Sequence, residues 1–298
     1  MAKQEKVQIL MSTYNGEQYL SEQIESLLRQ TYPDFEILIR DDGSTDGTRD
    51  LLKKYEKEYR NIQIFLEENK GVTGSFFRLL ELSDASYVAF CDQDDVWMEK
   101  KIERAVSALK TVKGEALYCG NKMLVDAELK EIGISDTKRM RPGFGNALVE
   151  NIATGCTIVM NQKLTEKIKQ QIPKHAVLHD WWCYLMAAYY GEVIYDEKPY
   201  IYYRQHGDNQ VGGSSGFVEE TDSKIKYLRK SRGRLKAQLT EFYHCNHGKE
   251  ERDKLLLQVL ETQHFGGKIK MIFNSRIYRQ KKLDNFVVRG LFLINAML

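Results

Sequence analysis

Alternating strand and helix patterns over residues 7–91 constrain the fold of this chain most strongly. Each short apolar run is followed by a turn and then by a segment whose apolar side chains recur with helical spacing. Strands are expected at Val7–Thr13, Phe35–Arg40, Ile62–Leu66 and Tyr87–Cys91, and helices at Glu17–Gln30, Thr48–Tyr59 and Ser75–Leu82. Short links between such elements predict an α/β fold with a mostly parallel sheet and right-handed crossovers.

Polar turns follow three of these strands: Thr13-Tyr-Asn-Gly, Asp41-Asp-Gly-Ser and Asp92-Gln-Asp-Asp. The carboxyl ends of parallel strands meet at one edge of a sheet, where α/β proteins bind nucleotides, so these turns are expected side by side. The chain contains neither Gly-x-x-x-x-Gly-Lys-Ser/Thr nor Gly-x-Gly-x-x-Gly. Phosphate would therefore be held by a metal ion and basic side chains.

Three carboxylates, Asp92, Asp94 and Asp95, directly follow the apolar run that ends at Cys91. Carboxylates this close repel unless a cation lies between them, and their hard oxygen atoms suit Mg²⁺ or Mn²⁺. The alternative is a solvated acidic loop in which Asp95 caps the next helix. A calcium loop beginning near Asp41 is excluded, because Lys53 stands where such a loop needs a bidentate glutamate.

A second acidic candidate lies in His179-Asp-Trp-Trp182, which opens a helix reaching Tyr190. Asp180 falls in the first turn, where the positive end of the helix dipole favours a carboxylate. Trp181 and Trp182 would form an aromatic wall against which sugar rings stack. The alternative is a capping aspartate beside core tryptophans.

The remaining polar candidates lie near the end of a strand expected at Tyr200–His206. His206 would face the same crevice as the carboxylates, which favours a metal-binding role. Arg204 is a candidate for pairing with a diphosphate, with a surface salt bridge as the alternative. Upstream, a strand is expected at Ala153–Met160 and an acceptor-side loop at residues 130–149.

Six motifs in this order resemble the family-2 glycosyltransferases, which have the GT-A fold, use nucleotide sugars and invert the transferred centre. The motifs, which span residues 12–207, are Ser-Thr-Tyr-Asn-Gly, Asp-Asp-Gly-Ser-Thr-Asp-Gly-Thr, Asn-Lys-Gly-Val, Cys-Asp-Gln-Asp-Asp-Val-Trp, His-Asp-Trp-Trp and Tyr-Arg-Gln-His-Gly. The forms Asp-Gln-Asp-Asp-Val-Trp and Tyr-Arg-Gln-His most resemble bacterial rhamnosyltransferases of cell-wall and capsular polysaccharide synthesis.

The resemblance implies roles for individual residues. Thr13 and Asp41 would contact the pyrimidine base, and Asp92 would contact the ribose. Asp94 would ligate the divalent metal that bridges the diphosphate. His206 would be a second metal ligand or a diphosphate contact.

The same resemblance makes Asp180 the general base that deprotonates the acceptor hydroxyl. Gly71 would let the backbone pass close to the nucleotide, as a glycine permits. The other residues expected at the donor are Tyr14, Asn15, Asp42, Asn69 and Arg204, and those expected at the acceptor are Trp181 and Trp182.

Charge is unevenly distributed, although the net charge is only +2. Residues 217–298 hold 17 Lys and Arg against 9 Asp and Glu, whereas residues 1–216 hold 27 against 33. We therefore expect a catalytic domain at 1–216 and a basic helical extension at 217–298, with helices at Lys224–Phe242 and Glu251–Phe265. Basic residues mixed with aromatic and aliphatic ones from Lys268 to the C-terminus suit an anionic membrane surface. A helical lid on the catalytic domain or a homo-oligomer contact is the alternative, and no motif for nucleic-acid binding accompanies the charge.

Composition predicts a cytoplasmic protein, peripheral at the membrane if the extension binds lipid. The mean hydropathy is −0.49, the five cysteines are widely spaced, the first strand begins near the N-terminus, and no apolar run approaches 18 residues.

The favoured activity is transfer of L-rhamnose from its dTDP donor to a glycan or lipid-linked acceptor. The alternative donors are UDP-galactose and UDP-glucose. More distant alternatives are a nucleotidyltransferase, whose glycine-rich basic loop is absent at residues 12–16, and a non-catalytic nucleotide-sugar-binding module.

Overall fold

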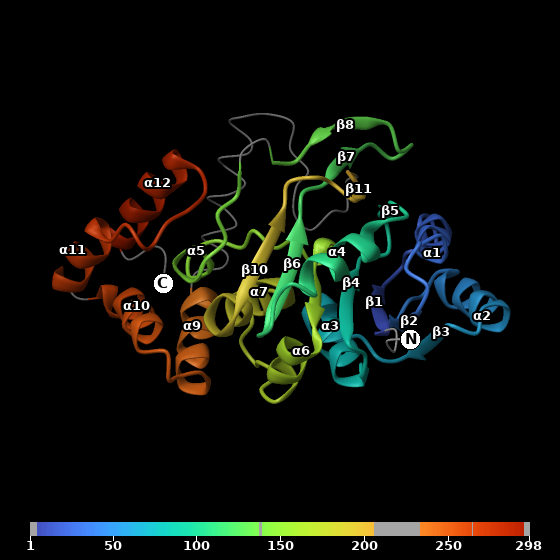
Figure 1. Cartoon of the computed structure of the whole chain (residues 1–298), viewed down its shortest axis with the longest axis horizontal. Coiled ribbons are helices and arrows are strands. Elements are labelled where there is room, and N and C mark those ends of the chain that lie inside the picture. Colours follow the sequence, from blue (N-terminus) through green and yellow to red (C-terminus); the bar gives the residue numbers. More distant parts are fainter. Residues whose placement is uncertain (1–4, 137–138, 206–232, 264, 295–298) are drawn as a thin grey trace.

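The computed structural model describes residues 5–136, 139–205, 233–263 and 265–294. Its centre is a seven-stranded sheet in the order β10-β6-β9-β4-β1-β2-β3 (Figure 1). The strands are β1 (Val7–Thr13), β2 (Phe35–Asp41), β3 (Ile62–Leu66), β4 (Tyr87–Cys91), β6 (Ala116–Gly120), β9 (Val159–Asn161) and β10 (Glu192–Asp196). Strands β1 to β4 are parallel, β10 is parallel to β6, and β9 is antiparallel to both of its neighbours. The predicted α/β fold is confirmed.

Helices cover both faces of this sheet because successive strand residues point to opposite sides. In β1, Ile9 packs with α1 (Leu20–Leu28), α2 (Thr48–Glu58) and α4 (Lys101–Leu109). Leu10, the next residue, belongs to the core formed with α3 (Gly71–Leu82), α6 (Gln162–Lys169) and α7 (His179–Tyr190). The central strands are buried on both faces, which explains their continuous apolar runs.

A second, four-stranded sheet lies beside the carboxyl ends of the central strands. Its order is β5-β11-β7-β8, formed by β5 (Val96–Trp97), β11 (Ile201–Arg204), β7 (Met123–Val125) and β8 (Glu131–Ile134). Strand β11 pairs antiparallel with β5 and parallel with β7. This pairing brings the end of β11 next to the acidic loop between β4 and β5.

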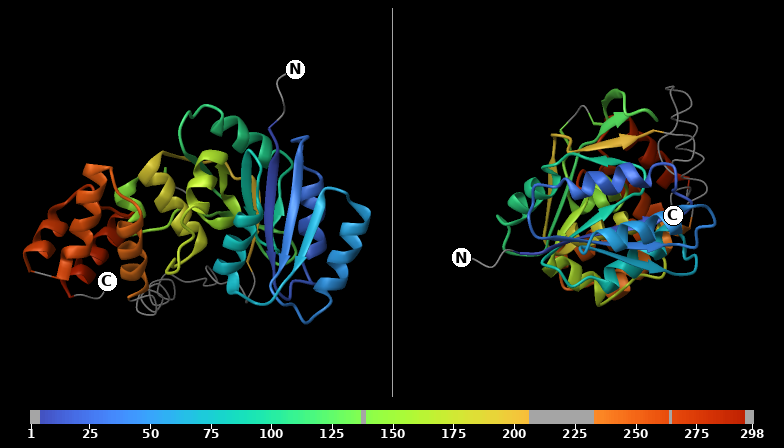
Figure 2. Two further views of the ribbon diagram at one scale, coloured as in Figure 1. Left: turned by 90° about the horizontal axis from the view of Figure 1, so that it is seen from below. Right: turned by 90° about the vertical axis from the view of Figure 1, so that its right-hand side faces the viewer.

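The C-terminal helices extend the α7 side of the molecule (Figure 2). They are α9 (Arg234–Cys245), α10 (Glu250–Leu260), the short η2 (Glu261–Gln263), α11 (Phe265–Phe273) and α12 (Lys282–Leu293). The ring of Phe242 in α9 meets that of Trp182 in α7 edge-on, with their centroids 5.4 Å apart. Apolar residues of all four α-helices join the core of α3, α6 and α7. The predicted domain boundary after residue 216 lies outside the described residues.

Two segments differ from their predicted structure. Of the strand expected at Ala153–Met160, only β9 is extended, and it follows a 3₁₀ turn, η1 (Gly155–Thr157). The turn forms because the Gly155 amide donates to Asp180 rather than to a strand. The loop expected at residues 130–149 contains β8 and a short helix, α5 (Phe144–Ala147), against which the chain segment after α11 packs.

All five cysteines are free. Within the described ranges, no helix has both the length and the apolar character needed to cross a bilayer.

Candidate active site

The three polar turns lie side by side, as predicted, because β1 is hydrogen-bonded to both β2 and β4. Thr13 at the end of β1 is level with Asp41 at the end of β2, and its hydroxyl donates to Oδ1 of Asp41 at 3.4 Å. Across the other side of β1, Gln93 accepts from the Tyr14 amide at 2.8 Å and donates to the Tyr14 carbonyl at 3.1 Å. These paired hydrogen bonds fix the first turn to the acidic loop.

The turn after β2 is organised by its own carboxylates. Oδ2 of Asp41, which is fully buried, accepts from the Ser44 amide at 3.0 Å and from Nε of Arg49 at 2.6 Å. Asp42 pairs with the buried guanidinium of Arg40 and accepts from the Lys70 amide at 2.6 Å. The expected donor-side residues of this turn are therefore held rigidly.

The remaining expected donor-side residues adopt backbone conformations that suit their types. Gly71 has φ +72°, the left-handed region that glycine enters without strain, and no atom lies within 4 Å of the position a Cβ would take. Asn69 donates to the Asp42 carbonyl at 2.8 Å, which places Gly71 beside the second turn. Asn15 has φ +47°, and its side chain accepts from the Thr45 amide at 2.8 Å.

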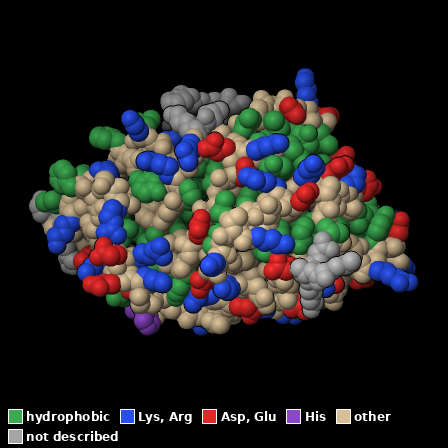
Figure 3. Space-filling view, viewed as in Figure 1, with side chains coloured by type: hydrophobic (Ala, Val, Ile, Leu, Met, Phe, Trp, Pro, Cys, Tyr) green, Lys and Arg blue, Asp and Glu red, His purple; other side chains and the backbone are tan. Residues whose placement is uncertain are grey.

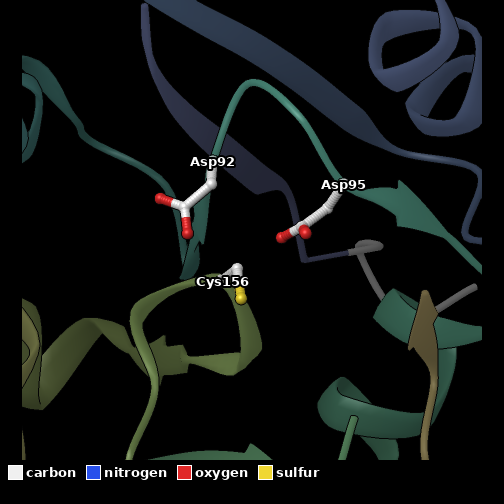
Figure 4. A group of neighbouring side chains, drawn as sticks. All are labelled: Asp92, Asp95 and Cys156. Atoms are coloured by element: carbon white, nitrogen blue, oxygen red, sulfur yellow. The ribbon is translucent and has the colours of Figure 1, made fainter. Parts of the chain in front are cut away.

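The acidic loop forms a compact cluster with a cysteine from η1 (Figure 4). Asp92, Asp95 and Cys156 each offer a ligand atom, and these atoms all lie within 4.8 Å of one another. Asp95 is 1% exposed, and among the described residues its Oδ2 has no hydrogen-bond partner. Asp95 is not a helix cap, because the next helix begins at Lys101 with Lys100 as its cap.

Burial makes ionisation of this cluster costly. Burial, followed by the fields of Asp94 and Asp180, raises the pKa of Asp92 to about 7. Burial and the neighbouring Asp94 and Asp92 carboxylates also raise the pKa of Asp95 well above its usual range. Asp94 therefore belongs to the same cluster electrostatically, although the three gathered ligand atoms do not include its own.

Lys101 acts electrostatically on the cluster, although no sequence motif marks it as a site residue. It is 2% exposed, and its Nζ lies 3.3 Å from the centroid of the Trp97 ring. Burial lowers its pKa to about 8, against the opposing effects of nearby Cys156, Cys91 and the carboxylates. Asp95 and Asp92 are among the groups that raise this pKa, so the charge of the lysine partly offsets theirs.

Asp180 lies in the first turn of α7 and acts electrostatically on Asp92. Its Oδ2 accepts from the Gly155 amide at 3.0 Å, and its Oδ1 accepts from the Trp181 amide at 2.6 Å. Burial raises its pKa to about 6, although both hydrogen bonds favour the ionised form. Its effect on the pKa of Asp92 shows that the two carboxylates share one environment.

Lys122, in the turn between β6 and β7, is the cation that faces both of these carboxylates. Its charge lowers the pKa of Asp92 and of Asp180, opposing the effect of burial on each. Its Nζ donates to Oγ1 of Thr154 at 2.7 Å and lies 5.0 Å from the Tyr203 ring centroid. The sequence signal was present, since a lysine follows directly after a strand end, but such lysines are too common to single out.

His179 and Gly155 set the position of Asp180. The imidazole stacks on Phe76 with ring centroids 4.0 Å apart, and burial lowers its pKa to about 3, so it is neutral. A Cβ on Gly155 would lie 2.9 Å from Nε2 of His179. Only glycine therefore lets η1 approach α7 closely enough to donate to Asp180.

The prediction that Trp181 and Trp182 form an aromatic wall for sugar rings is wrong. Trp182 is fully buried, and Trp181 is 7% exposed with its Nε1 donating to the Ala147 carbonyl at 2.7 Å. Both rings belong to the core between α7, α5 and the C-terminal helices. The alternative of core tryptophans beside a buried aspartate is the correct one.

Arg204 braces the acidic loop. It is 2% exposed, its amide donates to Oδ1 of Asp95 at 3.2 Å, and its Nε donates to the Asp94 carbonyl at 2.9 Å. Its guanidinium also forms an ion pair with Glu22. This placement favours the salt-bridge alternative, in a buried form, over direct contact with a diphosphate. His206 lies outside the described residues.

Residues 8–169 match the protein-family model for Glycosyl transferase family 2. The dTDP-rhamnosyl transferase RfbG of Shigella flexneri is 33% identical over 232 residues, which cover 74% of this chain and 77% of RfbG. The UDP-Glc:alpha-D-GlcNAc-diphosphoundecaprenol beta-1,3-glucosyltransferase WfgD of Escherichia coli is 30% identical over 160 residues, which cover 53% of this chain and 61% of WfgD.

Two solved structures share the architecture. TarS 1–349 of S. aureus in complex with UDP-GlcNAc has a TM-score of 0.62 at 16% identity, covering 98% of this chain and 82% of that one. The mannosyltransferase PcManGT of Pyrobaculum calidifontis, in complex with GDP-Man and Mn²⁺, has a TM-score of 0.56 at 14% identity. The match covers 99% of this chain and 81% of PcManGT. At these identities the likeness shows the fold, which is the GT-A type that the six motifs implied.

Proposed function

Since the chain belongs to glycosyltransferase family 2, we propose that it transfers L-rhamnose from dTDP-rhamnose to a hydroxyl of a glycan acceptor in cell-surface polysaccharide synthesis. Membership of this family establishes that the enzyme is a glycosyltransferase that uses a nucleotide-sugar donor. The rhamnosyl donor is supported by the 33% identity to RfbG over 77% of its length.

The observation that carries the proposal is the shared environment of Asp180 and Asp92 at the carboxyl edge of the sheet. A donor nucleoside resting on the turns that end β1 and β2 would place its diphosphate over the acidic loop. The transferred sugar would then lie between that loop and Asp180. This arrangement supplies a leaving-group side and a base side, as an inverting displacement needs.

Nucleotide recognition is assigned to the turn residues. Thr13 and Asp41 would contact the base, Asp92 the ribose, and the backbone at Gly71 would lie against the nucleotide. The exposed ring of Tyr14 and the turns held by Asn15, Asp42 and Asn69 complete the donor side. Their hydrogen bonds to neighbouring loops support a preformed site.

The acidic cluster fits a divalent cation. An unpartnered buried oxygen on Asp95 and the raised pKa values of Asp92 and Asp95 mark a site that gains from positive charge. Burial also raises the pKa of Cys156, which keeps the thiol protonated and able to donate to a carboxylate. Asp94, with Asp92 and Asp95 beside it and His206 as a further ligand, would hold Mg²⁺ or Mn²⁺. Such an ion neutralises charge on a departing diphosphate.

Asp180 would act as the general base. As the acceptor oxygen forms its bond to the anomeric carbon, the carboxylate takes the hydroxyl proton, and the bond from that carbon to the diphosphate oxygen breaks. Attack from the face opposite the leaving group inverts the anomeric centre. The two backbone amides that hold Asp180 fix its oxygens for this task, and Arg204 acts indirectly by holding the acidic loop.

A donor panel tests the proposal. The purified protein is incubated with dTDP-rhamnose, UDP-glucose, UDP-galactose, UDP-GlcNAc and GDP-mannose, and nucleoside diphosphate release is measured with and without candidate acceptors. Release from dTDP-rhamnose that is lost in Asp180→Asn supports the proposal. Release from a different donor alone would contradict the rhamnosyl assignment.

UDP-glucose is the second candidate donor because of the 30% identity to WfgD. The shorter match makes it the weaker one. A lipid-linked acceptor would favour an enzyme that works at the inner face of the cell membrane, from the cytoplasmic side.

A further inference from the structure

Helices α11 and α12 form an antiparallel pair at the end of the molecule farthest from β3 (Figures 1 and 2). Nζ of Lys268 in α11 donates to the Leu293 carbonyl of α12 at 2.8 Å. The guanidinium of Arg289 in α12 donates to the Ile272 carbonyl of α11. The segment between the helices is tied to α5 by a hydrogen bond of 3.0 Å from Asn146 to the Tyr278 carbonyl.

Each helix of this pair has two apolar sides, of which one is covered. Met271, Val288 and Phe292 are 1–2% exposed and belong to the main core. The other side faces solvent, with Phe273 81% exposed and Phe286 78% exposed. Both rings are therefore uncovered within the described chain.

The exposed apolar residues follow helical spacing rather than lying singly. In α12 and its C-cap they are Leu283, Phe286, Val287, Leu293 and Ile294, with exposures of 60%, 78%, 40%, 46% and 70%. In α11, Ile269 is 42% exposed and precedes Phe273 by one turn. A stripe at i, i+3, i+4, i+10 and i+11 is what a helix shows when one side rests on an apolar phase. We call these seven residues the apolar face.

Positive charge accompanies the apolar face. Residues 265–294 contain seven Lys and Arg, at positions 268, 270, 276, 279, 281, 282 and 289, against the single acid Asp284. Of these, Arg276 pairs with Glu251, and Arg279 pairs with Glu150 and Asp284. Lys270 and Lys282 are exposed beside Ile269 and Leu283. In Figure 3, hydrophobic and basic side chains alternate over the region of α11 and α12.

We propose that the apolar face binds an anionic lipid surface, with its aromatic and aliphatic side chains inserted at the headgroup boundary and its lysines against lipid phosphates. Helices of 9 and 12 residues are too short to cross a bilayer, so they would lie in its plane. A second copy of the chain is a poor occupant, because a symmetric contact would oppose two strongly basic rims. Nucleic acid would not need seven exposed apolar side chains. Binding is independent of sugar transfer, and only its purpose, access to a lipid-linked acceptor, rests on the proposed function.

Vesicle flotation of the full chain tests this binding. One vesicle set is phosphatidylcholine alone, and the other is phosphatidylcholine and phosphatidylglycerol in equal parts. We expect recovery with the anionic vesicles, weaker recovery at high salt, and little with phosphatidylcholine alone. Equal recovery on both sets would overturn the charge-based part of the proposal, and no recovery on either would overturn all of it.

Two variants and a control separate the contributions. Phe273→Ser with Phe286→Ser should weaken binding by roughly tenfold or more, since two aromatic side chains no longer leave water. Lys270→Gln with Lys282→Gln should weaken binding to anionic vesicles only. Ile132→Ser, at a site 62% exposed in β8, should bind as the unaltered chain does. Undiminished flotation of the Phe273 and Phe286 variant would refute the assignment of this face.

Other outcomes are also decisive. If the serine variant dissociates a dimer in sedimentation while neither form binds vesicles, the face is an interface between copies and the lipid proposal is wrong. Vesicle binding without sugar release from any donor would refute the proposed function and leave this inference standing. Transfer to a water-soluble acceptor without vesicle binding would support the proposed function and refute the lipid-binding inference.

Discussion

The amide of Gly155 donates a hydrogen bond of 3.0 Å to Oδ2 of Asp180, joining the 3₁₀ turn before β9 to the first turn of α7. Together with the Trp181 amide, which donates to Oδ1, this contact fixes both carboxylate oxygens. It depends on a residue without a side chain, because a Cβ at position 155 would lie 2.9 Å from Nε2 of His179 and 3.7 Å from Cβ of Asp180.

Gly155→Ala should therefore lower turnover. The added methyl group must push His179 or η1 aside, and a displaced base loses alignment with the acceptor hydroxyl, which costs roughly tenfold to a hundredfold in kcat. Donor affinity should change less than kcat, because Thr13 and Asp41 lie at the ends of β1 and β2, although Cys156 of η1 lies close to Asp92 and Asp95. The matched control is Gly114→Ala, where nothing lies within 4 Å of the new Cβ. Equal kcat for both alanine variants would contradict this role for Gly155.

Asp180→Asn should retain donor binding and lower turnover by roughly 10²–10⁴. The amide keeps the shape of the side chain but cannot accept the hydroxyl proton. Isothermal titration with the nucleoside diphosphate and steady-state kinetics measure the two properties separately. Turnover close to that of the unaltered enzyme would remove Asp180 from the mechanism.

The same substitution should raise stability at neutral pH. The folded-state pKa of Asp180, about 6, lies above its ordinary value, so the folded protein binds the proton more tightly than the unfolded chain does. Its contribution to stability is complete below the unfolded pKa and is lost as the pH rises through about 6. Asparagine does not ionise, so the Tm of Asp180→Asn should exceed that of the unaltered protein at pH 8 but match it near pH 4. A Tm difference that does not vary with pH would show that the carboxylate is not penalised by burial.

Divalent cations should stabilise the folded protein. Burial, followed by repulsion from the neighbouring carboxylates, raises the pKa values of Asp92 and Asp95, and a bound cation would offset the clustered negative charge. Mn²⁺ or Mg²⁺ should raise the Tm at pH 7.5, EDTA should reverse the rise, and chelation should abolish transfer. Asp94→Asn should lose most of the shift, whereas Asp50→Asn, at a side chain 82% exposed on α2, should keep it. A Tm unmoved by either ion would indicate that the cluster binds no metal.

Lys122→Met should slow the reaction and move its pH dependence. The lysine lowers the pKa of Asp92 and Asp180, so its loss should raise both and shift the acidic limb of the rate profile to higher pH. We expect roughly tenfold lower kcat/KM near pH 6 and a smaller loss near pH 8. The measurement is kcat/KM across the pH range, and the control is Lys163→Met on the surface of α6. A uniform loss at every pH would assign Lys122 a structural role.

Much of the fold followed from local patterns. The runs that became β1, β2, β3 and β4 are apolar because the sheet is covered on both faces, so these strands and their parallel arrangement could be predicted. The α/β architecture and the convergence of the Thr13, Asp41 and Asp92 turns depend only on that order.

The elements that were misjudged depend on contacts between distant segments. Residues 153–158 have strand character, yet Gly155 turns away because Asp180 offers an acceptor. Trp181 and Trp182 resemble a ligand-stacking surface in the sequence, but Trp181 donates to Ala147 of α5 and Trp182 packs against Phe242 of α9. These partners lie far away in the sequence.

Site residues were missed for a related reason. Lys101, Lys122 and Cys156 carry no motif, and their relevance comes from distances that only the packed chain defines. Arg204 was noticed in the sequence, but its buried position under the acidic loop reflects the pairing of β11 with β5 and β7.

The single core that joins α7 to α9 and α10 has a mechanical consequence. The residue that would deprotonate the acceptor sits at one end of α7, while the rings of Trp182 and Tyr189 farther along it are wedged against Phe242. The α11–α12 pair is thus joined to the helix that carries Asp180 through one continuous packed core. If the apolar face rests on a membrane, this packing would hold Asp180 at one distance from the lipid. Only acceptors whose reacting hydroxyl protrudes that far would then be glycosylated.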